Sequence, residues 1–134
     1  MKELKVEARV ENLPQVLEFI DTELENSGCD MKNQMKIDMA VEELFVNIAH
    51  YAYRENVGDA WIRYFVENDC AGISLIDNGV HYDPLAKDDP DVTLSAEERQ
   101  IGGLGIYMVK NSMDDVRYEY TNNQNITTII KSLK

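Results

Sequence analysis

Residues 71–84 read AGISLIDNGVHYDP, and this stretch decides the fold because an apolar run passes directly into a polar loop. The run AGISLI has the length and composition of a buried strand, and the Asn-Gly pair after it is typical of a sharp change of direction. A second glycine cluster, GGLGIYMV at 102–109, opens a segment with the composition of a helix. Glycines at a strand end and at a helix start indicate a phosphate cradle, although neither GxxxxGK[ST] nor a GxGxxG directly after a strand is present.

The pattern around these two loops predicts an α+β fold. Strands and helices are expected in the order strand, two helices, two strands, loop, helix, two strands, which places most strands in antiparallel hairpins. We therefore expect a two-layer α/β sandwich with a mixed, mostly antiparallel sheet and helices on one face. The expected strands are 4–10, 59–68, 71–79 and a hairpin over 115–133; the expected helices are 12–28, 30–54 and 104–112; the expected turns are Asn68–Asp69 and Asn122–Asn123.

Composition and charge narrow the class of protein. The chain has 134 residues, 44% of them hydrophobic and 28% charged, which predicts a single domain over residues 1–134. Its net charge of −12 repels a phosphate backbone, so direct nucleic-acid binding is not expected. There is no apolar leader and no run of membrane-spanning length, and the two cysteines are best interpreted as free thiols of a soluble cytoplasmic protein.

The helix expected over 30–54 carries a polar stripe. Glu43, Asn47 and His50 lie at positions i, i+4 and i+7, beside a broad apolar arc that needs burial. One interpretation is a solvated stripe on an amphipathic helix. The other makes Glu43 a general base and Asn47 a magnesium ligand through its amide oxygen. The helix alone does not decide between them.

The loops favour the second interpretation. The Asp77 carboxylate, fixed at a strand end, can accept from an exocyclic amine such as that of adenine, and Gly79 permits a ring to approach the backbone. Gly102, Gly103 and Gly105 bring the backbone close to phosphates at a helix N-terminus. The polar segment 85–101 between the two glycine boxes is long for a simple connection and is interpreted as a functional loop or lid.

Taken together, these motifs resemble the GHKL, or histidine kinase-like, ATPase superfamily, and within it the anti-sigma-factor serine/threonine kinases. EELFVN at 42–47 looks like the N-box, DNGVHYDP at 77–84 like the DxGxxFDP box, and GGLGIYMV at 102–109 like the GLGLxLV box. The likeness runs from about residue 4 to the C-terminus.

The resemblance implies ATP and Mg²⁺ as cofactors, with a lid over the nucleotide, and it assigns roles residue by residue. Glu43 would be the base, Asn47 the magnesium ligand and Asp77 the adenine reader. The remaining nucleotide contacts implied are Gly79, Gly102, Gly103, Leu104 and Gly105, with Arg99 as a basic lid residue, Thr128 as a support for the adenine pocket and His50 either at the phosphates or a plain core or surface imidazole. In the anti-sigma branch a histidine often stands where this chain has Tyr51.

By resemblance, the protein would be a homodimeric kinase that phosphorylates a small anti-anti-sigma (STAS-type) partner and sequesters a sigma factor. A non-catalytic ATP-gated protein-binding module and an orphan ATPase subunit of a two-component-like system are the alternatives. The intact acid at Glu43 favours the kinase, because a pure binding module has no need of a base.

Overall fold

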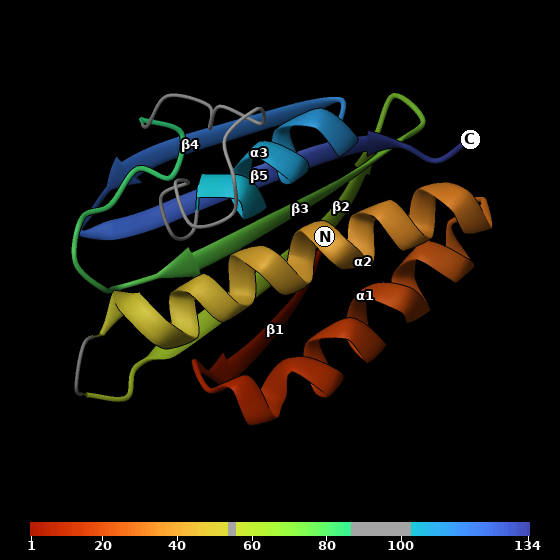
Figure 1. Cartoon of the computed structure of the whole chain (residues 1–134). Coiled ribbons are helices and arrows are strands. Elements are labelled where there is room, and N and C mark those ends of the chain that lie inside the picture. The colour runs from red at the N-terminus through yellow and green to blue at the C-terminus, as the bar shows by residue number, and fades with distance from the viewer. Residues whose placement is uncertain (54–55, 87–102) are drawn as a thin grey trace.

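The computed structural model describes residues 1–53, 56–86 and 103–134, and in these ranges one antiparallel sheet carries helices on one face (Figure 1). The strands follow the order β1-β2-β3-β5-β4, so β3 lies at the centre. Their bounds are β1 Lys2–Glu7, β2 Asp59–Glu67, β3 Cys70–Asp77, β4 Asp115–Thr121 and β5 Gln124–Ser132. The α+β sandwich is confirmed, and every pairing between these strands is antiparallel, where a partly mixed sheet was expected.

Two asparagine-rich turns set the hairpins. Asn68 and Asp69 have φ of 53° and 61°, and Asn122 and Asn123 have φ of 53° and 62°. Positive φ at both central residues is the geometry of the two-residue turn whose twist matches that of the flanking strands. Asn and Asp tolerate this region better than other non-glycine residues. Both turns lie at the positions that the sequence predicts.

The two long helices pack side by side on the sheet. Helix α1 (Leu13–Asn26) follows a short 3-10 turn, η1 (Val10–Asn12). Helix α2 (Met31–Asn47) is capped by the preceding Asp30, whose side chain accepts from the Asn33 amide at 2.8 Å. Gly28, with φ of 74°, ends the α1 region as expected. Asn12 precedes α1 but does not cap it, because its side-chain amide donates to the Glu7 carbonyl at 2.9 Å.

Helix α2 does not continue as an α-helix to residue 54, which corrects that expectation. It widens after Asn47 into one π-helical segment, η2 (Ile48–Ala52). Such segments shift the hydrogen-bonding pattern and are frequent near functional sites. Here the change brings the Ala52 carbonyl to the Val80 amide, which donates to it at 2.9 Å.

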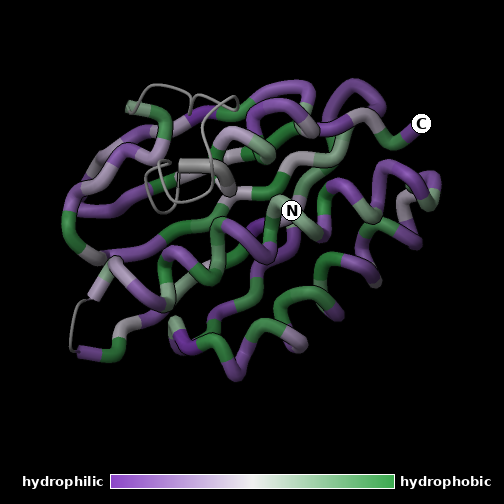
Figure 2. The backbone as a smooth tube through the Cα atoms, in the orientation of Figure 1, coloured by the Kyte–Doolittle hydropathy of each residue, from purple (hydrophilic) through white to green (hydrophobic). Residues whose placement is uncertain are grey.

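The core lies between the sheet and the helices, where Figure 2 shows the hydrophobic segments of both layers. The inner face of the sheet meets the inner faces of α1, α2 and α3 (Gly103–Ser112). The fully buried side chains include Ile20, Ile37, Val41, Phe45, Ile62, Ile73, Leu75 and Ile129. No helix in the described ranges is long and apolar enough to cross a membrane.

Two acidic residues, Asp21 of α1 and Asp38 of α2, lie close together where the two helices pack. The Gln34 side-chain amide donates to Asp21 Oδ1 at 3.2 Å, and Asp38 Oδ1 is buried without a hydrogen-bond partner among the described residues. Burial, followed by the neighbouring Asp21 carboxyl and the charge of Glu25, raises the pKa of Asp38 to about 8. The ionised form of Asp38 is therefore disfavoured in the folded protein.

This pKa shift predicts that Asp38 makes stability fall with rising pH. A group with a raised folded-state pKa contributes stability that is complete below the unfolded-state value, near 4, and is lost as pH rises through about 8. In Asp38→Asn, urea-denaturation stability should therefore fall less between pH 5 and pH 8 than in the wild type. Asp69→Asn, in an exposed turn, is the control and should follow the wild-type curve. Parallel curves for wild type and Asp38→Asn would contradict the prediction.

Candidate functional site

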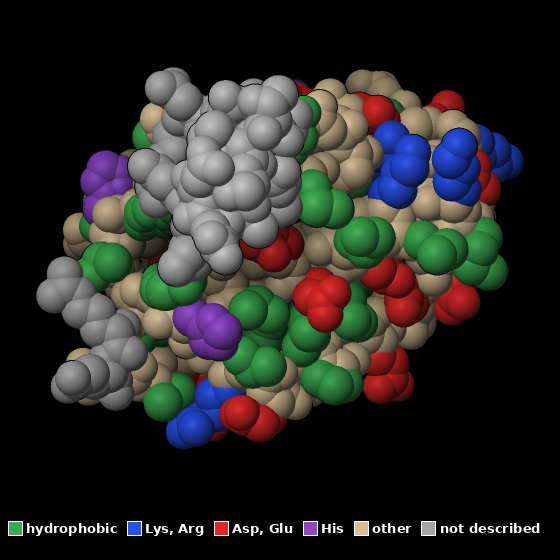
Figure 3. All heavy atoms as spheres, viewed as in Figure 1, with side chains coloured by type: hydrophobic (Ala, Val, Ile, Leu, Met, Phe, Trp, Pro, Cys, Tyr) green, Lys and Arg blue, Asp and Glu red, His purple; other side chains and the backbone are tan. Residues whose placement is uncertain are grey.

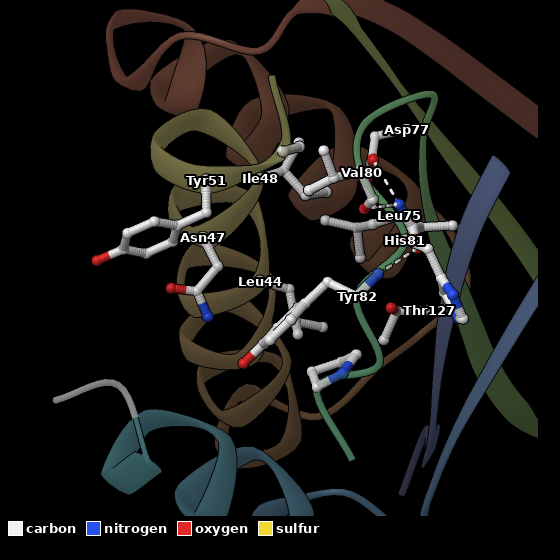
Figure 4. A pocket seen from close by; sticks show the side chains of 13 residues that line it. Leu44, Asn47, Ile48, Tyr51, Leu75, Asp77, Val80, His81, Tyr82 and Thr127 are labelled. Carbon is white, nitrogen blue, oxygen red and sulfur yellow. Dashed lines mark hydrogen bonds between the residues drawn. The ribbon is translucent and has the colours of Figure 1, made fainter. Parts of the chain in front are cut away.

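A cavity of about 380 Å³ opens between the end of α2, the end of the sheet where β3 stops and β5 starts, and the loop after β3 (Figure 4). Its walls are mainly apolar, with a few polar side chains at defined points, which is the usual composition of a small-molecule site. The lining residues are Leu44, Asn47, Ile48, Tyr51, Ala52, Leu75, Asp77, Val80, His81, Tyr82, Pro84, Asn125 and Thr127.

Asp77 supplies the buried acid of the cavity. The residue is 5% exposed, and its Oδ1 accepts from the Gly79 amide at 2.8 Å and from Asn125 Nδ2 at 3.0 Å. Burial raises the pKa of Asp77, and these two hydrogen bonds oppose that rise. Both of these hydrogen bonds from described residues use Oδ1, so Oδ2 is the carboxylate oxygen that they do not engage.

Gly79 presses the loop after β3 against the end of the helix. A Cβ at this position would overlap the carbonyl of Ala52, which is backbone and cannot rotate away. The same carbonyl accepts from the Val80 amide at 2.9 Å. The glycine is thus needed for contact within the chain itself, in addition to any close approach by a ligand.

Glu43 and Asn47 meet the glycine-rich start of α3. Asn47 Nδ2 lies 3.4 Å from Glu43 Oε1, and a Cβ on Gly105 would overlap the Glu43 carboxylate. Asn47 lines the cavity, whereas Glu43 lies beside it and is only partly buried. Two members of the polar stripe, Glu43 and Asn47, therefore lie at α3 and the cavity. Gly103 and Leu104 begin α3, while Arg99 and Gly102 lie outside the described residues.

Two residues that the sequence analysis assigned to the nucleotide site, Thr128 and His50, do not line the cavity. Thr128 points away from the cavity, since its hydroxyl lies 2.7 Å from that of Ser74, and the cavity is lined by Thr127 instead. Side chains alternate along a strand, so an error of one residue moves the group to the other face of the sheet. His50 is exposed beside Tyr51, with ring centroids 5.8 Å apart, and only Tyr51 lines the cavity.

Several lining residues were not singled out from the sequence, and Asn125 is the most connected of them. It lies opposite Asp77 in the β3–β5 register. Asparagine is depleted in strands, so its presence among the β-branched residues of β5 is the sequence feature that could have singled it out. Nearby, the His81 ring stacks on Tyr120 at 4.3 Å between centroids. Tyr82 occupies the phenylalanine position of the DxGxxFDP pattern and lies at the cavity.

The fold agrees with the comparisons. A family model for the histidine kinase-like ATPase domain matches residues 6–131, and the chain belongs to that family. A serine-protein kinase RsbW of Bacillus cereus (strain AH187) is 28% identical over 119 residues, which cover 86% of this chain and 74% of the relative. RsbW of B. cereus (strain Q1) is 36% identical over 87 residues, which cover 62% of this chain and 53% of the relative. RsbW of Listeria monocytogenes is 30% identical over 89 residues, which cover 63% and 57%.

Two solved structures share the fold. The RsbU and RsbW domains of a Mycobacterium tuberculosis protein match with a TM-score of 0.68 at 16% identity, covering 98% of this chain and 32% of that one. The histidine kinase AdeS of Acinetobacter baumannii matches with a TM-score of 0.50 at 13% identity, covering 100% and 70%. At these identities the likeness concerns the fold.

The contact between Gly79 and Ala52 can be tested directly. Gly79→Ala should push the loop away from η2 and weaken the bond from the Val80 amide to the Ala52 carbonyl, because overpacking against backbone typically costs about 1–3 kcal/mol. Native-state hydrogen exchange should then show lost protection at the Val80 amide. The Asp114 amide, which donates to the Ile130 carbonyl at 2.9 Å on the far hairpin, serves as the internal control. Unchanged protection at Val80 would refute this role of Gly79.

Proposed function

We propose that the cavity binds ATP and that the protein is an anti-sigma-factor-like serine/threonine kinase. The carrying observation is that one cavity is lined by both the buried Asp77 carboxylate, which suits a base amine, and Asn47, which lies beside Glu43. Glu43 in turn contacts the helix start at Gly105, which suits phosphates. The similarity to serine-protein kinases named RsbW supports the choice of reaction.

Adenine fits the inner part of the cavity. Asp77 Oδ2 would accept from the exocyclic amine, while the apolar groups of Leu44, Ile48, Leu75 and Val80 would cover the ring faces. A guanine ring presents a carbonyl where adenine has its amine, so an ionised acid at this point selects against it. Thr127, which lies opposite Leu75 and lines the same cavity as Asp77, replaces Thr128 as the proposed support of the base.

The triphosphate would lie toward α3. Figure 3 shows acidic and hydrophobic side chains together on the helical face, and the whole chain carries −12. The phosphate charge must therefore be offset locally, and the N-terminus of α3 contributes backbone N–H groups and the positive end of a helix dipole. Arg99, Gly102, Gly103 and Leu104 remain proposed phosphate contacts, and His50 is proposed as a surface residue.

Asn47 and Glu43 present the oxygen atoms that suit Mg²⁺. Since Asn47 Nδ2 faces Glu43, the Asn47 Oδ1 atom would be the one to bind a metal held jointly with phosphate oxygens. Bound Mg²⁺ would neutralise charge that develops on the transferred phosphoryl group. Glu43 would accept the proton of the attacking serine or threonine hydroxyl, and Asn47 would keep its carboxylate oriented.

The acceptor and the sequestered partner follow the anti-sigma branch. We propose a small anti-anti-sigma protein as the phosphate acceptor, a sigma factor as the sequestered protein and a homodimer as the working form. A non-catalytic ATP-gated module is the second candidate. It is favoured by the contact of the Glu43 carboxylate with Asn47 and Gly105, which could make that acid purely structural.

The adenine assignment predicts weaker ATP binding in Asp77→Asn. The substitution removes the charged acceptor and can place a donor against the adenine amine. A charge-assisted hydrogen bond is worth about 1.5–3 kcal/mol, so affinity should fall at least about tenfold by titration calorimetry. Asp69→Asn makes the same chemical change in an exposed turn and should bind as the wild type. Equal ATP affinity in Asp77→Asn and wild type would refute the assignment.

The kinase proposal is tested by Glu43→Gln, with the exposed neighbour in Glu42→Gln as its matched control. Loss of a general base should reduce phosphate transfer to a co-purified partner, and slow ATP hydrolysis by the protein alone, by about 10²–10⁴-fold. ATP affinity should change little, because it rests on Asp77 and Asn47. Asn47→Ala should instead lose both binding and turnover. Wild-type turnover in Glu43→Gln would favour the binding module.

A further inference from the structure

Asn125 connects three parts of the cavity wall. It is 5% exposed on β5, and its Nδ2 donates to Asp77 Oδ1 at 3.0 Å and to the Val80 carbonyl at 2.9 Å. Its Oδ1 accepts from the Tyr82 amide at 3.1 Å and from the Tyr118 hydroxyl at 2.5 Å. One side chain thus joins the end of β3, the loop after it and the edge strand β4.

The partners of Asn125 require a primary amide. The two shorter bonds from the nitrogen go to the Asp77 carboxylate and the Val80 carbonyl, and the Gly79 carbonyl lies at 3.5 Å. Two donors, the Tyr82 amide and the Tyr118 hydroxyl, face the oxygen. An amide has two N–H donors and an oxygen with two lone pairs, so all four partners are satisfied. A carboxylate would set a negative oxygen against Asp77, and a hydroxyl could serve only part of the set.

The same bonds determine the shape of the cavity. Val80 and Tyr82 both line it, and each is bonded to Asn125 through its backbone. The Val80 amide is bonded on its other side to Ala52 of η2. The loop is therefore held between β5 and the end of the helix, and removing either attachment would free the wall that faces the base.

We propose that Asn125 is a positioning residue for nucleotide recognition, which fixes Asp77 Oδ1 so that Oδ2 faces the base and which holds the wall formed by Val80 and Tyr82. The inference rests on the proposed ATP site. It adds a residue that acts through Asp77 and the loop backbone and needs no contact with the nucleotide.

Asn125→Asp provides a test that a merely structural role would not pass. At pH 8 the new carboxylate and Asp77 would repel each other across a hydrogen-bond distance, and affinity for MgATP should fall at least about tenfold. As pH falls toward 5.5, the pair should take up one proton and regain a donor facing Asp77. The loss relative to wild type should then shrink, by up to about tenfold per pH unit.

The ratio to wild type is the quantity to compare. The other titratable groups around this position, namely Tyr53, His81, Asp83, Tyr118 and Tyr120, are present in every variant. Asn56→Asp makes the same chemical change at an exposed residue and should show a ratio near one at every pH. Asn125→Thr keeps a good strand former and removes the amide, so its affinity should fall by a factor that does not vary with pH. Melting curves would show that each variant is folded.

A pH-dependent ratio for Asn125→Asp together with a constant loss for Asn125→Thr supports the inference. Wild-type affinity in Asn125→Thr, or a ratio for Asn125→Asp that is the same at pH 8 and pH 5.5, would overturn it while leaving the ATP site intact. Failure of the wild-type protein to bind MgATP at any pH would overturn the proposed function instead.

Discussion

Burying the Asp77 carboxylate at the end of the central strand costs free energy unless hydrogen bonds replace the lost water. The fold supplies such bonds from two directions, the Gly79 amide in the following loop and the Asn125 side chain on the neighbouring strand. The loop that carries the Gly79 amide is bonded to Ala52 through Val80, and the strand that carries Asn125 pairs with β3 and β4. The acid is consequently held in one orientation in a cavity whose walls are mainly apolar.

Antiparallel pairing explains why these groups meet. Asp77, the last residue of β3, and Asn125, near the start of β5, lie opposite each other in the register. Both are therefore at the same end of the sheet. Helix α2 passes over this end of the sheet and is followed by η2. The Ala52 carbonyl of η2 accepts from the Val80 amide and so holds the loop. Glu43 and Asn47, at positions i and i+4 of α2, then face the start of α3. The groups proposed to bind the base and those proposed to bind the phosphates thus lie along one helix and at one end of the sheet.

The sequence predicted those features that local chemistry determines. Paired Asn and Asp residues marked both hairpin turns, Gly28 ended the α1 region, and the spacing of Glu43, Asn47 and Asp77 within known motifs indicated the family. What it could not supply was register between distant strands. The assignment of Thr128 in place of Thr127 was an error of one residue that reversed the face, and Asn125 required the β3–β5 pairing to be known. The widening of α2 after Asn47 likewise accompanies a contact distant in sequence, the hydrogen bond from the Val80 amide to the Ala52 carbonyl.

The most direct test of the account is to locate the base. Amide resonances of the isotope-labelled protein would be followed by NMR during titration with MgATP and, separately, with MgGTP. The account predicts that MgATP shifts the amides of Gly79, Val80 and Tyr82, together with Gly105 at the phosphate end, and that MgGTP at the same concentrations leaves the three loop amides unchanged. Equal shifts with both nucleotides, or shifts confined to residues outside the cavity, would contradict it.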